Sequence, residues 1–278
     1  PMTDKLLCIY HGNCDDGFAA AWCVRAALGD GVEFYPGVYQ QDPPDVTGRK
    51  VLFVDFSYKK PVLERMATAA QSILILDHHL TAQADLAEFQ MPTHCLPTPG
   101  LGYWMPNTGI SAHFDMHRSG AGLAWDYFHA GHGRPDFINY IEDRDLWRRA
   151  LPGGDEFTIA LRSYPQDFPL WDDLVQRGAN DLIREGHSIQ RYYRLRVEEL
   201  KRSAYRATIN YDGSLAGTQD AKIMIANAPY FAASEVAGEL CEIAGVAFGA
   251  CYFEVSQGRW QYSLRSRGDF DVSNVARC

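Results

Sequence analysis

Three short apolar runs, each followed at once by polar side chains, constrain the fold of this chain most strongly. They are Leu6–Tyr10, Val51–Val54 and Ile73–Leu76, and their lengths are those of buried strands. A helical pattern follows the first run over residues 16–28, and another begins near Lys60-Pro61, where proline suits a first helical turn. Apolar strands that alternate with helices are typical of a parallel sheet covered on both faces. The sequence therefore predicts an α/β fold.

The residues that follow these strands are of the types that bind metals. The first run leads into His11-Gly12-Asn13-Cys14-Asp15-Asp16-Gly17, the second into Asp55, and the third into Asp77-His78-His79. The carboxyl ends of parallel strands meet at one edge of a sheet, where open α/β folds place their sites. Carboxylates mixed with imidazoles suit a pair of divalent cations; Mn²⁺ fits well, and Mg²⁺ or Co²⁺ is an alternative. The pattern predicts a metal-dependent enzyme.

The later part of the chain has a different pattern. A stretch rich in proline and glycine runs from Met91 to Gly109, and helical segments follow it. A long helix rich in Arg and Glu is expected over residues 181–205, and strands with one helix among them follow. We therefore expect a catalytic domain over 1–180, a helical linker over 181–205 and a smaller mixed α/β domain over 206–278. The cleft between the two domains is the natural place for a site.

Composition narrows the classes of protein to which the chain can belong. With 26 Lys and Arg against 35 Asp and Glu, the net charge of −9 leaves no general basic surface for duplex nucleic acid. No apolar run approaches the roughly 18–20 residues of a membrane span. The seven cysteines are odd in number and form no C-x-x-C pair, which favours reduced thiols. We expect a soluble, cytoplasmic protein and leave a homodimer open.

Four motifs, in chain order, resemble those of the DHH phosphoesterase family. The segment from His11 to Gly17 resembles the first motif, Asp55 the second and Asp77-His78-His79 the third. The fourth is Glu142-Asp143-Arg144-Asp145-Leu146-Trp147. The part of the chain after the linker resembles the DHHA1 substrate-binding domain of the same family, so the resemblance extends over the whole chain.

The resemblance also implies roles for individual residues. Two Mn²⁺ would be bound by a set that comprises His11, Asp15 or Asp16 or both, Asp55, His78 and Asp143. Asp55 is the candidate to bridge the two ions, Asp77 would orient a histidine, and His79 would face the scissile phosphate. Asp143 is preferred to Asp145 because the family's fourth-motif aspartate has an aromatic residue four positions later, as Trp147 is here.

Two features depart from the family pattern. The family's first motif usually has aspartates four and six residues after its histidine, whereas Asp15 and Asp16 are adjacent. Asp16 is the preferred ligand of the two, because an Asp-Gly step opens the helix in the family. DHHA1 domains usually finish with a glycine-rich segment that contains a histidine. This sequence stops at Cys278 without one, and we expect that segment to be missing from it.

Within the family, the first and fourth motifs are most similar to those of the nanoRNase B-like oligoribonucleases and cyclic-nucleotide phosphodiesterases. This resemblance implies hydrolysis of short oligoribonucleotides or linear dinucleotides to mononucleotides. Arg265, at the end of a predicted strand, is expected to clamp the substrate phosphate. The alternatives are a phosphatase for polyphosphate, pyrophosphate or 3′-phosphoadenosine 5′-phosphate, a cyclic-nucleotide phosphodiesterase, and an inactive nucleotide-binding regulator.

Several weaker signals have two readings each. The segment Ser119-Gly120-Ala121-Gly122 begins a helix either for close packing or for contact with a phosphate. Three aromatic residues, Tyr103, Trp104 and Tyr230, offer rings for stacking on a base, although core packing is the default for each.

Overall fold

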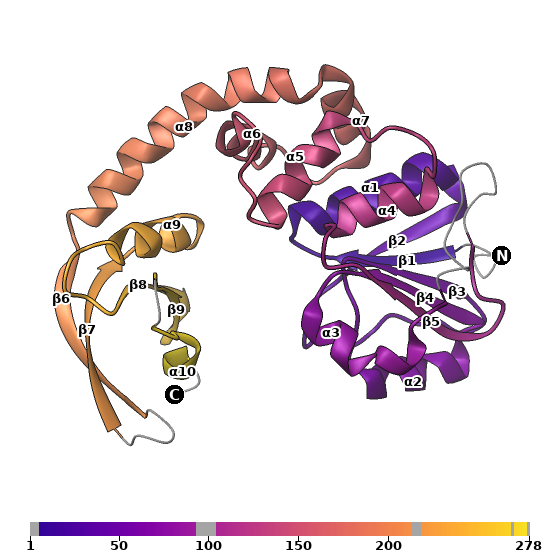
Figure 1. Cartoon of the computed structure of the whole chain (residues 1–278), viewed down its shortest axis with the longest axis horizontal. Coiled ribbons are helices and arrows are strands. Elements are labelled where there is room, and N and C mark those ends of the chain that lie inside the picture. The colour runs from indigo at the N-terminus through magenta and orange to yellow at the C-terminus, as the bar shows by residue number, and fades with distance from the viewer. Residues whose placement is uncertain (1–5, 93–103, 213–217, 268–269, 277–278) are drawn as a thin grey trace. The chain divides into compact units, whose positions relative to one another are not determined.

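The computed structural model describes residues 6–92, 104–212, 218–267 and 270–276, and it divides into two compact units (Figure 1). The first unit is Pro1–Ile189 and the second is Gln190–Cys278. Helix α8 (Ala179–Lys201) contributes residues to both units. The sequence predicts this helix as a separate linker over 181–205, whereas its first half belongs to the first unit.

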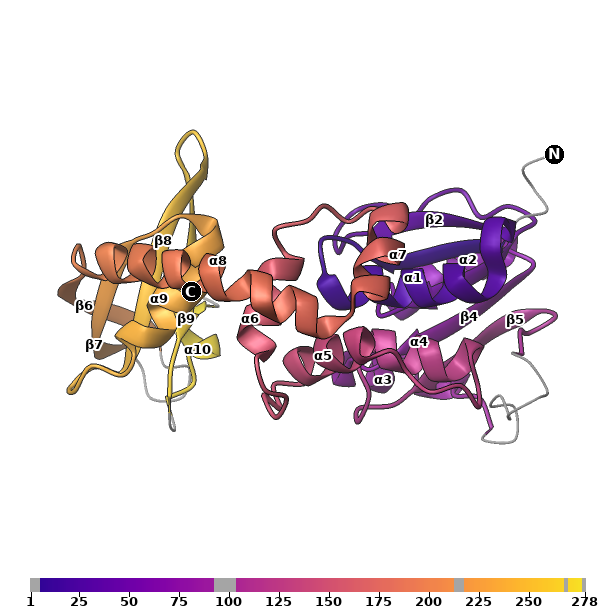
Figure 2. The same ribbon diagram turned by 90° about the horizontal axis from the view of Figure 1, so that it is seen from above.

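The first unit contains a parallel sheet, as the apolar runs predict. Its strands are β1 (Leu6–His11), β2 (Val32–Gly37), β3 (Lys50–Val54), β4 (Ser72–Asp77) and β5 (Gly109–Phe114). The five strands are all parallel, in the order β2-β1-β3-β4-β5, and Figure 2 shows β2 and β5 at the two edges. β5 is as long as β1 and β4, but it begins at a glycine and carries polar residues, so it lacks the continuous apolar run by which the sequence predicts β1, β3 and β4.

Helices cover both faces of this sheet. Figure 1 shows α1 (Asp15–Leu28) and α4 (Gly120–Phe128) on one face, with α2 (Lys60–Ala69) and α3 (Leu80–Asp85) on the other. Leu52 and Val54 of β3 pack in the core on the α1 side, whereas Val51 and Phe53 pack in the core on the α2 side. Every residue of β4 is buried. This two-sided burial explains why the strands are uninterrupted apolar runs.

Three further helices extend the core on the α1 side. They are α5 (Asp136–Asp145), α6 (Gly154–Leu161) and α7 (Phe168–Arg177), and short 3₁₀ turns lie at Gly29–Gly31 and Ala87–Phe89. Phe137 contacts both Phe157 and Trp171 edge-on, with ring centroids 5.3 Å apart in each case. Trp171 in turn meets Phe18 of α1 at 4.8 Å. The aromatic rings thus fix α5 and α6 beside the start of α1.

The second unit is a smaller mixed α/β structure. Its sheet has the order β6-β7-β8-β9, in which β7 and β8 are parallel and the outer pairs are antiparallel. The strands are β6 (Tyr205–Asp212), β7 (Thr218–Asn227), β8 (Phe248–Ser256) and β9 (Arg259–Arg265), with the helices α9 (Tyr230–Leu240) and α10 (Ser273–Ala276). Among the described residues, every helix is too short or too polar to cross a membrane.

Candidate metal centre

Three neighbouring strands deliver the predicted residues to one edge of the first sheet. β1 ends at His11, Asp55 directly follows β3, and β4 ends at Asp77, which leads into His78 and His79. The chain order of the strands reverses at β1, which has β2 on one side and β3 on the other. Such a reversal is where open α/β sheets place ligands.

The backbone at Asp55 is unusual for a residue with a side chain. Its φ is +56°, in the left-handed region, which costs free energy for any residue other than glycine. The side chain is almost completely buried. Strained residues of this kind are concentrated at functional sites, where the position of the side chain is needed for function despite its cost in folding stability.

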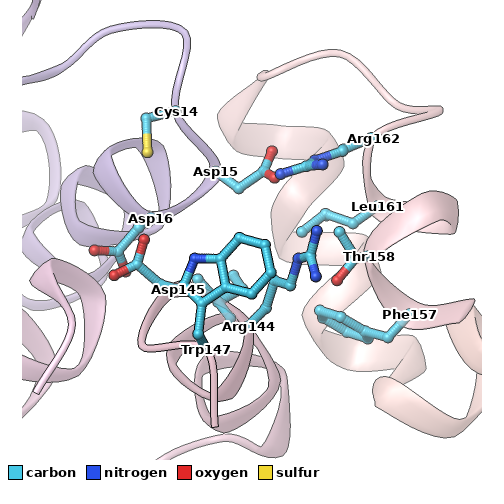
Figure 3. Close-up of a pocket in the computed structure, with 11 residues that line it drawn as sticks. Cys14, Asp15, Asp16, Arg144, Asp145, Trp147, Phe157, Thr158, Leu161 and Arg162 are labelled. Atoms are coloured by element: carbon cyan, nitrogen blue, oxygen red, sulfur yellow. The ribbon is translucent and has the colours of Figure 1, made fainter. Parts of the chain in front are cut away.

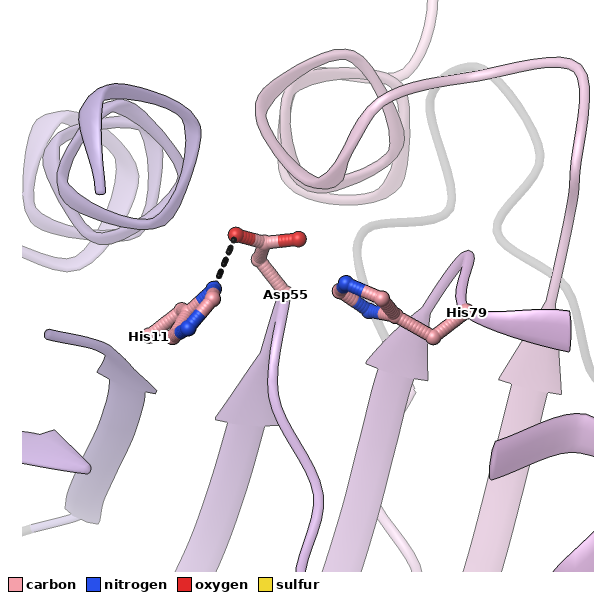
Figure 4. Close-up of side chains that lie close together, drawn as sticks. All are labelled: His11, Asp55 and His79. Atoms are coloured by element: carbon pink, nitrogen blue, oxygen red, sulfur yellow. Dashed lines mark ion pairs between the residues drawn. The ribbon is translucent and has the colours of Figure 1, made fainter. Parts of the chain in front are cut away.

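His11, Asp55 and His79 form the first group of possible ligands (Figure 4). The three candidate ligand atoms lie within 4.8 Å of one another. His11 Nδ1 is 3.4 Å from Asp55 Oδ2, and both atoms are buried without a hydrogen bond. Because buried polar atoms normally have partners, this pair is well suited to a cation that both atoms would ligate.

Asp16, His78 and Asp145 form the second group, whose candidate ligand atoms also lie within 4.8 Å of one another. His78 Nε2 is 3.7 Å from Asp16 Oδ2 and 3.6 Å from Asp145 Oδ2. The same nitrogen lies 3.0 Å from Asp55 Oδ1. Asp55 therefore has one oxygen toward each group, which is the arrangement that a bridging carboxylate requires.

Asp77 supports the two histidines that follow it. Its Oδ1 accepts a hydrogen bond from the backbone N–H of His78 at 2.7 Å, and it is hydrogen-bonded to Nδ1 of His79 at 2.7 Å. This hydrogen bond raises the pKa of His79 above its usual value, against the effect of burial. With Nδ1 held in this way, Nε2 of His79 can face a cation or a phosphate oxygen. The histidine that Asp77 was expected to orient is thus His79.

The pKa values of two carboxylates in the cluster reflect burial and crowded negative charge. Burial, together with the charges of Asp55 and Asp145, raises the pKa of Asp16 well above its usual value. Burial and the charge of Asp55 also raise the pKa of Asp145. A divalent cation among these carboxylates would neutralise the neighbouring charge that adds to the effect of burial in both shifts.

The pKa values of His78 and Asp55, whose side chains lie within hydrogen-bond distance of each other, shift in opposite directions. Burial opposes a charged His78 ring, but the hydrogen bond to Asp55 and the nearby carboxylates raise its pKa to about 9. Burial likewise opposes ionisation of Asp55, but contacts with His11 and His78 lower its pKa to about 2. Asp55 is therefore ionised at neutral pH, as a metal ligand must be.

Asp16 also binds the start of helix α4. Its Oδ2 accepts a hydrogen bond from the backbone N–H of Gly120 at 2.6 Å, and its Oδ1 accepts one from that of Ala121 at 3.0 Å. A Cβ atom on Gly120 would lie only 2.3 Å from the Cβ of Asp55. Of the two interpretations of Ser119–Gly122, the structure thus shows close packing, and the free N–H groups of this helix end bind a carboxylate.

Two predicted ligands lie outside both groups. The Asp143 carboxylate accepts hydrogen bonds from the backbone N–H of Ala150 at 2.9 Å and of Leu151 at 3.3 Å. Asp145 takes the place expected for Asp143, because helix positions two apart point to opposite sides of α5. Asp15 is similarly directed away from Asp16, and its Oδ2 pairs with Nε of Arg162 at 2.6 Å.

The remaining candidates belong to neither group. Arg265, at the end of β9, is exposed and donates hydrogen bonds to the Leu264 carbonyl at 2.8 Å and to Ser234 Oγ at 2.7 Å. Trp104 packs against the core, Tyr230 is 77% exposed, and Tyr103 falls outside the described residues.

No family model matches this chain, and no solved structure matches it significantly. One curated relative is the Uncharacterized protein R106 of Acanthamoeba polyphaga mimivirus, which is 26% identical over 289 residues. The match covers 96% of this chain, and the chain spans 63% of the length of that relative. The relative's name assigns no activity.

Proposed function

We propose that this chain is a metal-dependent phosphoesterase of the DHH/DHHA1 type that cleaves short oligoribonucleotides or linear dinucleotides to mononucleotides. The observation that supports it best is the pair of His/Asp groups at one sheet edge, with an Asp55 oxygen directed at each. Two adjacent cation sites that share a carboxylate suit in-line displacement at phosphorus. The net charge of −9 fits a short substrate better than a long polyanion.

The chain's own residues would divide the work as follows. His11 and Asp55 would hold one cation, and Asp16, His78 and Asp145 the other, with Asp55 between them. Bound Mn²⁺ ions would supply an activated water and neutralise charge on the phosphate. His79, fixed by Asp77, would complete the first group or face a phosphate oxygen. Arg265 of the second unit would contribute a further contact with the substrate phosphate.

Hydrolysis of the dinucleotide pApA in the presence of Mn²⁺ tests the proposal. We expect release of AMP, and we expect Asp55→Asn to reduce turnover by more than the roughly 10–100-fold that loss of a supporting residue of a metal site costs. Asp30→Asn, at an exposed position just beyond the opposite end of α1 from Asp16, is the matched control and should behave as wild type.

Two results would overturn parts of this proposal. Wild-type turnover by Asp55→Asn would exclude the site. Faster release of phosphate from polyphosphate than of AMP from pApA would exclude the proposed substrate class and favour a phosphatase.

A further inference from the structure

A pocket adjoins the second His/Asp group (Figure 3). It has about 560 Å³ of empty space, part of it open to solvent, and Asp16 and Asp145 line it. Phe157 and Leu161 of α6 supply an apolar wall. The enclosed part of this space is about 150 Å³, less than the roughly 300–1,000 Å³ of a site that surrounds a whole small molecule, so the pocket can take only part of a ligand. The pocket is therefore placed to hold the part of a substrate that extends away from the cations.

Trp147 is the exceptional side chain of this pocket. Its ring is 66% exposed, although large aromatic residues are generally well buried. Its φ is +54°, a strained value for a residue with a side chain. The guanidinium carbons of Arg144 and Arg149 lie 4.8 Å and 4.7 Å from its ring centroid. Trp147 is therefore a residue with a strained backbone whose indole ring is exposed beside two arginine side chains.

Asp143 holds the segment that presents this indole. Its carboxylate accepts the backbone N–H groups of Ala150 and Leu151, and its backbone carbonyl accepts the N–H of Arg148 at 3.0 Å. The N–H of Trp147 itself donates to the Arg144 carbonyl at 3.1 Å. Asp143 is buried, so these bonds are shielded from water. Asp143, which belongs to neither His/Asp group, therefore fixes the turn after α5.

We propose that Trp147 is the platform on which a base of the substrate stacks, with Asp143 as its positioning residue. This inference rests on the proposed function, because it assigns the nucleoside part of that substrate to the pocket. A base–aromatic stack changes affinity by roughly 5- to 150-fold, and an exposed cation–π contact by roughly 2- to 5-fold. A base can accordingly replace the exposed Arg149 guanidinium on the ring. Arg144, which lines the pocket, remains to offset the charge of a nearby phosphate.

Equilibrium binding to the full chain with Mn²⁺ tests the platform without requiring turnover. Titration calorimetry would compare AMP with ribose 5-phosphate, which carries the same phosphate but no base. We expect Trp147→Ala to weaken AMP binding by roughly 5- to 150-fold and to leave ribose 5-phosphate unchanged. Trp147→Phe, which keeps a ring, should recover most of the loss. Trp260→Ala, at an exposed tryptophan of the second unit, is the control and should bind both ligands as wild type.

Positioning by Asp143 predicts the same selective loss. Asp143→Ala should weaken AMP binding but leave ribose 5-phosphate and Mn²⁺ binding unchanged, whereas Asp143→Asn, which keeps an acceptor oxygen, should weaken AMP less. The platform is refuted if wild-type protein binds AMP no better than ribose 5-phosphate, or if Trp147→Ala weakens both ligands equally. If AMP binding depends on Trp147 but pApA is not cleaved, the hydrolase proposal alone fails. If pApA is cleaved and Trp147→Ala leaves KM unchanged, the platform alone fails.

Discussion

Replacing Gly120 with alanine would place a Cβ atom 2.3 Å from Asp55 Cβ and 2.9 Å from Asp16 Oδ2. Overpacking of a tight interior site costs about 1–3 kcal/mol, and a 2.3 Å contact with another Cβ belongs at the upper end. Alanine recovers up to about 1 kcal/mol through helix propensity and a less flexible unfolded chain. We therefore expect a net loss of about 2 kcal/mol, or roughly 4–8 °C in Tm for a unit of this size.

Urea denaturation followed by tryptophan fluorescence would measure this loss, because every tryptophan except Trp260 lies in the first unit. Gly154→Ala is a matched control. Gly154 is also the first residue of a helix, but an added Cβ would meet only Asp143 Oδ2 at 3.8 Å, an ordinary contact. The gain in helix propensity and the less flexible unfolded chain apply here without the clash, so we expect this variant to be as stable as wild type or more stable by up to about 1 kcal/mol.

The same experiment extends to the metal groups. Since either Asp55 or the start of α4 must move to admit the new methyl group, Gly120→Ala should also weaken Mn²⁺ binding, measured by calorimetry. If Gly120→Ala were as stable as Gly154→Ala and bound Mn²⁺ equally well, the close approach of α4 to Asp55 would be wrong.

Three further predictions concern the titratable residues. Asp145→Asn should weaken Mn²⁺ binding by at least about tenfold and Asp143→Asn by less than about twofold; calorimetry that ranks them in reverse would restore Asp143 as the ligand. Asp15→Asn should keep Mn²⁺ affinity, whereas Asp16→Asn should lose it and also lower the unfolding free energy by about 1–2 kcal/mol, since it binds the start of α4; equal effects in both assays would count against Asp16. In metal-free protein the pKa of His78 is raised to about 9, so the protonated ring stabilises the folded state. This contribution to folding stability is fully present below pH 6.5, the pKa of the ring in the unfolded chain. That contribution, at most about 3 kcal/mol, disappears as pH rises through 9. The pKa values of Asp16 and Asp145 are also raised, so the protein likewise loses stability as these two carboxyls ionise with rising pH, over a lower pH range. Calorimetric Tm should accordingly fall between pH 6 and 9.5 without metal; a rise over this range would contradict the electrostatic account.

Three strands of the first sheet, β1, β3 and β4, and the residues at their ends could be predicted from the sequence. Buried parallel strands are continuous apolar runs, so Val51–Val54 and Ile73–Leu76 stand out from their surroundings. The ends of parallel strands meet because hydrogen bonding fixes their register, with Val54 opposite Leu76. A polar residue after such a run therefore lies close to those after its neighbours.

The choice between Asp143 and Asp145 could not be made in the same way. Both belong to α5, and which of them faces the sheet edge depends on the rotation of the helix about its axis. Contacts of Phe137 with residues of α6 and α7 set that rotation. The preference for Asp143 came from the aromatic residue four positions later, Trp147, and that spacing carries no information about how α5 packs. Likewise, the fit of Gly120 against Asp55 depends on two segments far apart in the chain.

Asp16 binds the start of α4 and also belongs to the second His/Asp group, and this has a consequence for biosynthesis. Asp16 leaves the ribosome early, but the Gly120 N–H and the Asp145 carboxylate that lie beside it in the folded protein emerge more than one hundred residues later. At the usual rate of synthesis this delay is on the order of 10 seconds. A nascent chain cannot offer the finished second group to a cation during that interval. The proposed binding of a cation by this group should therefore be a late event, which follows translation of most of the first unit.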